Sequence, residues 1–146
     1  MKTFEELKEE LLTRAKNAGA CQSGYAMGLR SNTKADLLKA ITENWFWVLR
    51  YAKIIDAEYL EDNFTEEELS QVGIYTKNTH EVRTSSFAYD SATVEACDSA
   101  TVKACGNSYV EDCTGNIRPE SDYAIVKDYY NHKIYIKKGE FEIIEV

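Results

Sequence analysis

The sequence is poor in the residue types on which most active sites depend. Its 146 residues include two histidines, and its seven glycines are scattered rather than gathered into a phosphate-binding loop. His80 lies in a polar segment and His132 in an Asn-His-Lys turn, so neither stands beside a candidate nucleophile. Neighbouring acids such as Glu111 and Asp112 would point to opposite faces of a strand. We therefore expect no catalytic residues and no enzyme activity.

The sequence also lacks long apolar runs and an excess of basic residues. No stretch is long enough to cross a bilayer, and the N-terminus alternates charged with apolar residues, unlike a signal peptide. The net charge of −8 disfavours nucleic acid as a partner, because that binding needs Lys and Arg to neutralise phosphates. We expect a cytoplasmic protein with no membrane partner, and a protein partner that has a basic surface.

Four cysteines are present, and a reducing compartment predicts that they remain free thiols. Cys97, Cys105 and Cys113 are spaced eight residues apart, whereas zinc sites favour closely spaced pairs. We expect no metal site and no cofactor.

Helical signals dominate residues 1–75. Thr3 and Glu6 have the spacing of a capping box, which predicts a helix from residue 4 to about 17. Thr65 and Glu68 repeat that signal. Apolar residues that recur with gaps of three and four predict one long helix between these ends: Leu38, Ile41, Trp45, Val48, Ala52 and Ile55. We expect a helical domain over 1–75 and a linker over 76–83.

The densest charge run lies between Asp56 and Glu68, which contains seven acids and no Lys or Arg. Acids in a first helical turn are favoured by the helix dipole, and this explains the last three of them. The alternative is a patch for a basic protein partner, with these candidate residues: Asp56, Glu58, Glu61, Asp62, Glu66 and Glu67.

An eight-residue repeat follows, with the units DSATVEAC (90–97), DSATVKAC (98–105) and GNSYVEDC (106–113). Such periodicity outweighs local propensities. Within a unit, small apolar residues alternate with polar ones, as in a strand with one buried face. One unit is too short to enclose a core, whereas two units form a coil of two short strands that face each other.

The coil of two units predicts that residues sixteen positions apart stack in neighbouring coils. Val94, Val110 and Val126 should form one column, with Val102 in the facing sheet. The unit-final positions should form ladders: Cys97, Cys113 and Tyr129 in one, Tyr89 and Cys105 in the other. The fold class is therefore α+β, with a short two-sheet β-solenoid over 84–146 that ends in a C-terminal hairpin around Lys138 and Gly139.

The repeat resembles that of small bacterial and phage-type proteins with tandem octapeptides of the form DSATV or GNATV. The resemblance covers residues 84–113 well and 122–136 loosely. It implies a β-solenoid, and it implies no catalytic residues and no common activity. The three cysteines and the interruption at Pro119 depart from the usual pattern.

Three functional hypotheses follow from the sequence. The first is a non-enzymatic protein-binding module, such as an inhibitor or a phage-encoded antagonist of a host defence system, that uses an acidic or solenoid face. The second is a structural protein whose solenoids self-associate, so a homo-oligomer is left open. The third is a small-ligand binder or enzyme with a pocket between the helical domain and the solenoid, near Trp45, Trp47 and Tyr51.

Overall fold

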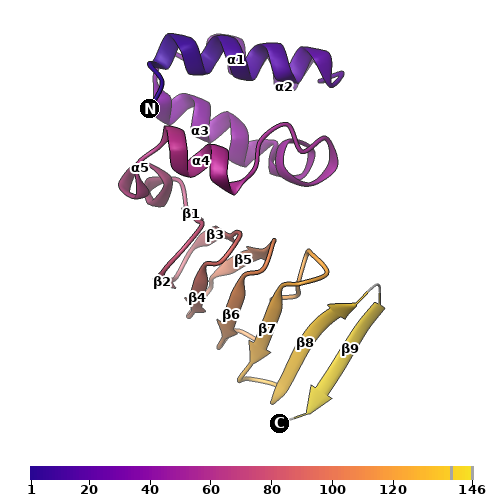
Figure 1. Ribbon diagram of the computed structural model, residues 1–146. Coiled ribbons are helices and arrows are strands. Elements are labelled where there is room, and N and C mark those ends of the chain that lie inside the picture. The colour runs from indigo at the N-terminus through magenta and orange to yellow at the C-terminus, as the bar shows by residue number, and fades with distance from the viewer. Residues whose placement is uncertain (139, 146) are drawn as a thin grey trace. The chain divides into compact units, whose positions relative to one another are not determined.

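The computed structural model describes residues 1–138 and 140–145 and divides the chain into two compact units. Helices make up the unit Met1–Val72, and strands make up the unit Gly73–Val146 (Figure 1). The α+β fold class is confirmed, with N-terminal helices followed by a β-solenoid of about three turns.

The helical unit contains five α-helices and one π-helix. Capping boxes start α1 at Thr3, α3 at Thr33 and α5 at Thr65, because in each the threonine side chain and the residue three positions on satisfy each other's backbone N–H groups. The first and the last of these confirm the expected helix starts. The bounds are α1 (Phe4–Asn17), α2 (Gln22–Arg30), α3 (Lys34–Glu43), π-helix η1 (Phe46–Tyr51), α4 (Ala57–Asn63) and α5 (Glu66–Gln71).

The prediction of one long helix through Ile55 is wrong. Helix α3 ends at Glu43, where the Asn44 side chain donates to the Ala40 carbonyl at 2.8 Å and competes with the backbone for that acceptor. The chain then widens into η1, in which the Ala52 N–H bonds to the Trp47 carbonyl at 2.8 Å. Within η1 both Val48 and Leu49 are buried.

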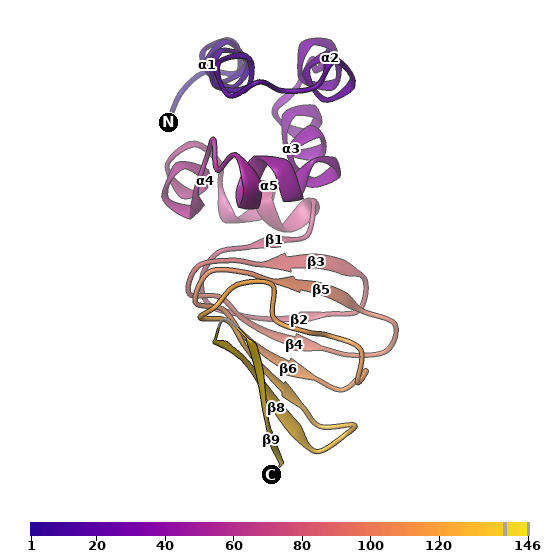
Figure 2. The same cartoon turned by 90° about the vertical axis from the view of Figure 1, so that its right-hand side faces the viewer.

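The C-terminal unit contains two sheets that face each other (Figure 2). The first sheet has the order β1-β3-β5, and the second has the order β2-β4-β6-β7-β8-β9. Strand pairs are parallel up to β7 and antiparallel from β7 to β9. The bounds are β1 (Ile74–Tyr75), β2 (Thr79–Val82), β3 (Ser85–Ala88), β4 (Thr93–Ala96), β5 (Thr101–Ala104), β6 (Tyr109–Asp112), β7 (Ile125–Asp128), β8 (Lys133–Lys138) and β9 (Glu140–Glu145).

The sixteen-residue register of the repeat is confirmed. Val94 pairs with Val110 and Val110 with Val126 in the second sheet, while Val102 lies in β5 of the first sheet. All three members of the valine column are fully buried. Between them the two sheets enclose a thin core made mainly of alanine and valine.

Each repeat unit begins with a residue in the left-handed region, which turns the chain from one sheet to the other. Asp90, Asp98 and Gly106 have φ angles of 51°, 54° and 60°. At Gly106 a Cβ atom would stand 2.7 Å from the backbone nitrogen of Asp90. Glycine is required there because the turns of successive coils approach so closely.

The division between units differs from the expected boundaries of 75 and 83. The helical unit ends at Val72, and the solenoid begins with β1 and with β2, which lies inside the segment expected as a linker. These two strands pair outside the repeat frame, since Ile74 pairs with Phe87 and Thr79 with Thr93. Their pairing offsets are 13 and 14 residues, which are not multiples of eight, so the octapeptide repeat does not predict these strands.

The interruption after β6 is organised by two buried aspartates. Asp112 and Asp128 are register partners, both fully buried, and they occupy the inward position that Ala96 fills in the preceding coil. The Asp112 carboxylate accepts hydrogen bonds at 2.7 to 3.2 Å from the backbone N–H groups of Thr114, Gly115 and Ile117 and from the Thr114 hydroxyl. It therefore holds the irregular loop onto the end of the core.

The loop itself replaces a fourth strand of the first sheet. Only an isolated bridge between Ala104 and Pro119 continues that sheet. Asp128 caps the next turn in the same way, because its two carboxylate oxygens accept from the backbone and side-chain nitrogens of Asn131 at 2.8 Å. The antiparallel pair of β8 and β9 then continues the second sheet as the expected hairpin, and the expected turn at Gly139 lies outside the described residues.

We predict that Asp112→Ala lowers the free energy of unfolding by about 3 kcal/mol, because it leaves several loop N–H groups without an acceptor. Urea unfolding measures this loss, and the amides of Gly115 and Ile117 should exchange faster in the variant. Asp122→Ala is the matched control, since Asp122 is exposed and surface changes stay within about 0.5 kcal/mol. Equal stability of the two variants would contradict the role assigned to Asp112.

Candidate functional site

The acidic residues predicted to bind a partner lie on two short helices, α4 and α5. Asp56 is the N-cap of α4, where its carboxylate accepts from the Tyr59 N–H at 2.8 Å. Glu66 and Glu67 stand in the first turn of α5, where the helix dipole favours acids. Glu58 and Asp62 are exposed and Glu61 is half-buried. Local helix stabilisation thus accounts for part of the run, and its role in partner binding stays a prediction.

The unit-final residues follow the strands in the expected register. The Cys113 N–H bonds to the Ala96 carbonyl at 3.0 Å, which sets Cys113 beside Cys97, and the Tyr129 N–H bonds to Asp112 in the same way at 2.8 Å. Burial raises the pKa of the Cys113 thiol, and the neighbouring thiol of Cys97 adds to that effect. On the other sheet, the Cys105 N–H bonds to Ala88 and the Tyr89 N–H to Tyr75, each at 2.8 Å.

The outward-facing residues of the second sheet form two continuous rows, in which each residue is the register partner of the next. Together these rows define what we call the outer face. One row begins polar and becomes apolar toward β8: Thr79, Thr93, Tyr109, Ile125 and Ile136. The other begins acidic and ends apolar: Glu81, Glu95, Glu111, Lys127, Ile134 and Ile144.

Three glutamates in adjacent parallel strands, Glu81, Glu95 and Glu111, are an unfavourable arrangement, because like charges directly opposite each other repel. Arg83 pairs with Glu81 at 2.5 Å at one end of this row. Glu95, in the middle, is exposed and has no basic partner within 4.0 Å among the described residues. Glu95 therefore has an acid on each side in the register and no ion pair to a described basic residue.

The third glutamate of the row, Glu111, is held by tyrosine. The hydroxyls of Tyr109 and Tyr129 both donate to one Glu111 oxygen, at 3.2 and 3.1 Å. Burial, followed by the negative charge of Glu111, raises the pKa of Tyr109 to about 12. Beyond this point the outer face exposes the large apolar side chains of Ile125 and Ile144, at 36% and 42% exposure, and Tyr129, which follows β7, is exposed beside it at 44%.

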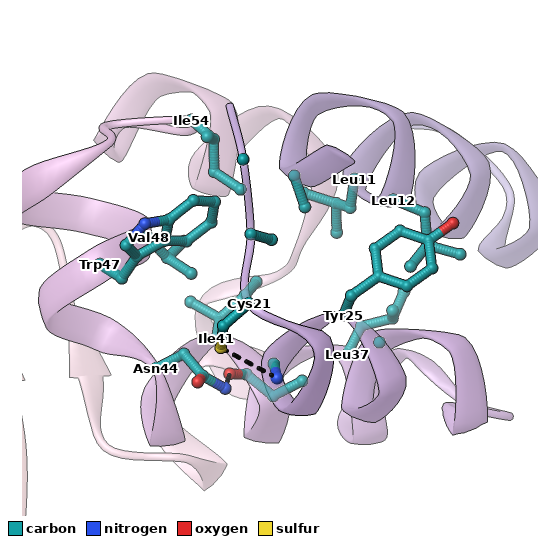
Figure 3. Close-up of a pocket in the computed structure, with 16 residues that line it drawn as sticks. Leu11, Leu12, Cys21, Tyr25, Leu37, Ile41, Asn44, Trp47, Val48 and Ile54 are labelled. Atoms are coloured by element: carbon teal, nitrogen blue, oxygen red, sulfur yellow. Dashed lines mark hydrogen bonds between the residues drawn. The ribbon is translucent and has the colours of Figure 1, made fainter. Parts of the chain in front are cut away.

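A separate feature is an apolar pocket of about 260 Å³ inside the helical unit (Figure 3). Its wall comes from α1, α2, α3, η1 and the connection between α1 and α2, and no charged residue contributes to it. The lining residues are Leu11, Leu12, Ala15, Gly19, Ala20, Cys21, Gly24, Tyr25, Gly28, Leu37, Ala40, Ile41, Asn44, Trp47, Val48 and Ile54. Trp47 is the only one of the three aromatic residues named in the ligand hypothesis that lines this pocket.

Two polar side chains, Cys21 and Asn44, lie together at one side of this apolar wall (Figure 3). The Cys21 thiol is the N-cap of α2, where its sulfur accepts from the Gly24 N–H at 3.4 Å and lies 3.3 Å from the Ser23 hydroxyl. The hydrogen bond with Ser23, followed by that with Gly24, lowers the pKa of the Cys21 thiol. The pocket thus has a thiol with raised thiolate character in its wall.

Comparisons with protein-family models, with curated proteins and with solved structures find no match to this chain. Within the part of the chain that the structure describes, no group of three or more acidic, histidine or cysteine side chains is arranged to hold a metal ion. The helices of that part are also too short or too polar to span a membrane. The outer face and the pocket are therefore the features from which a function has to be argued.

Sequence reasoning named a solenoid face as a possible binding surface without assigning residues to it, and it did not identify the pocket. The outer face was open to prediction, because the same sixteen-residue register that stacks the valines also stacks Glu95 on Glu111. The pocket depends on small residues rather than on a recognisable motif. The clue in the sequence was the spacing of Gly24 and Gly28, which places both glycines on one face of a short helix.

We predict that Cys21 is alkylated faster than Cys113 at pH 7.5, although both are exposed. Thiolate is the reactive form, so the lowered pKa of Cys21 speeds its reaction and the raised pKa of Cys113 slows it. Peptide mass spectrometry after timed iodoacetamide treatment measures both rates in one sample. Ser23→Ala should slow Cys21 several-fold and leave Cys113 unchanged, whereas equal rates in the native protein would contradict the prediction.

Proposed function

We propose that this protein is a non-enzymatic protein-binding module whose docking surface is the outer face of the solenoid's second sheet. The observation that carries the proposal is the column of Glu81, Glu95 and Glu111, in which three like charges stand in register on one face of the sheet. A partner that places Lys or Arg against this column relieves the repulsion on binding. The free energy of that relief then contributes to affinity.

The apolar part of the same face supports this proposal. Exposed Ile125 and Tyr129 adjoin the acidic column, so the face combines charge with an apolar area. Protein interfaces commonly bury a central apolar and aromatic area inside a polar rim. The partner we propose therefore has a basic segment next to an apolar one.

The proposed type of binding module is an inhibitor or regulator. An acidic chain of 146 residues suits an inhibitor or regulator that acts by occupying a partner's basic surface. The resemblance of its octapeptides to those of phage-type proteins favours a phage-encoded antagonist of a host protein among such regulators.

We predict that Glu95→Lys weakens partner binding at least tenfold while leaving stability unchanged or slightly higher. Charge reversal replaces an attraction with a repulsion at the partner, but within the fold it removes repulsion worth about 0.2–1 kcal/mol. Tagged native protein is used to capture partners from a lysate of the native host, and the captured partner is then purified. Isothermal titration calorimetry measures its dissociation constant for each variant.

Two further variants make this test specific. Ile125→Asp alters the apolar row and should also weaken binding, whereas Glu9→Lys makes the same charge change on an exposed position of α1 and should not. Partner binding that survives both outer-face variants would overturn the proposal. Light scattering on the native protein and Ile125→Asp separates the self-associating alternative, in which the native chain is oligomeric and the variant monomeric.

A further inference from the structure

The pocket of the helical unit exists because small residues stand where larger ones would fill it. Gly24 and Gly28 are four residues apart on α2, and Ala15 and Ala40 face them from α1 and α3. A Cβ atom on Gly28 would lie 3.1 Å from a Leu12 methyl group, so glycine allows α1 and α2 to approach closely there. The remaining wall is mostly leucine, isoleucine, valine and aromatic side chains, together with Cys21 and Asn44, which leaves a mainly apolar space.

The size of the pocket limits what it can hold. Its volume of about 260 Å³ exceeds that of an engineered protein cavity of about 150 Å³ that binds benzene. It lies just below the range of about 300–1,000 Å³ that is usual for drug-sized ligands. A bicyclic aromatic compound or a short-chain compound of similar bulk therefore fits.

The chemistry of the wall limits the ligand further. No charged residue lines the pocket, so an ionised ligand would lose its hydration without gaining a counter-ion. The Asn44 amide nitrogen donates to the Ala40 carbonyl, which assigns the other amide atom as oxygen, and that oxygen faces Gly24 at 3.3 Å from the site of a Cβ atom. Asn44 thus offers an amide oxygen as a hydrogen-bond acceptor in a wall that is mostly apolar and whose other polar atoms belong to Cys21, Tyr25 and Trp47.

From this geometry we propose that the helical unit binds an uncharged, mainly apolar small molecule of bicyclic size that carries one hydrogen-bond donor. The apolar body fills the space between α1, α2 and η1, with Trp47 and Leu11 in contact with it. The donor bonds to the side-chain oxygen of Asn44. The Cys21 thiol stands beside that position, so a bound ligand covers it (Figure 3).

Three matched probes test the ligand class. 2-Naphthol has the size, neutrality and donor that the pocket requires, 2-methoxynaphthalene lacks the donor, and 2-naphthoate is charged. Titration into the full-length protein, followed by amide chemical shifts, should show saturable binding of naphthol with shifts at Gly24 and Ala15. The ether should bind about fivefold more weakly, as expected for the loss of one neutral hydrogen bond. The naphthoate should bind at least a hundredfold more weakly.

Two substitutions on the same helix locate the site. Ala15→Leu fills the pocket and should weaken naphthol binding at least tenfold without lowering the unfolding midpoint, because the new side chain occupies empty apolar space. Thr13→Leu adds the same side chain on an exposed position of α1 and should leave binding unchanged. Bound naphthol should also slow alkylation of Cys21 several-fold while the rate at Cys113 stays constant.

Several outcomes would overturn this proposal. No saturable binding of naphthol, equal binding of naphthol and naphthoate, or unchanged binding in Ala15→Leu would each do so. If naphthol fails and Ala15→Leu instead abolishes capture of a protein partner, the pocket receives an apolar side chain of that partner. None of these results depends on the outer face, so the two proposals fail separately.

Discussion

The thin core between the two sheets constrains everything else in the solenoid. Each strand of the repeat has four residues, of which two point inward, and these are mostly alanine and valine. One coil alone buries too little apolar surface to be stable, so coils hold together only when they stack in register and share one core. This requirement fixes the sixteen-residue spacing, and it places a left-handed residue at Asp90, Asp98 and Gly106. It also explains why the carboxylates of Asp112 and Asp128 occur where a loop and a turn supply N–H donors.

The same register determines the outer surface. The register that stacks valine on valine inside the sheet also stacks Glu95 on Glu111 outside it, whereas in the next coil it sets Lys127 beside Glu111. At the two ends of the column the negative charge has a partner. Arg83 forms an ion pair with Glu81, and two tyrosine hydroxyls donate to Glu111. Glu95 shows that the chain does not remove the repulsion completely, although one substitution to lysine would do so. Sites where a local rule of stability is broken without compensation within the fold are the places to look for function.

The sequence was sufficient to predict the solenoid because its period and its alternation of apolar and polar residues act together. The prediction is wrong where the period is absent. Strands β1 and β2 pair at offsets of 13 and 14 residues, and the sequence places them in the helical domain and in a linker. The long helix failed for a different reason. Its apolar stripe continues through Asn44, but the competing hydrogen bond of that side chain ends α3 and allows the π-helix. Periodicity reports which side chains favour burial and does not report the backbone path between them.

Empty space is harder still to predict, since hydrophobic patterns describe side chains and a pocket consists of their absence. An unfilled apolar space lowers stability, because its lining atoms lack the dispersion contacts that a filled core provides. The helical unit keeps this space although a leucine in place of Ala15 would fill part of it. The acidic column and the pocket therefore share a property despite their different chemistry. Each lowers the stability of the fold, and in each case a single substitution would recover part of that stability. Selection for binding explains why such features persist.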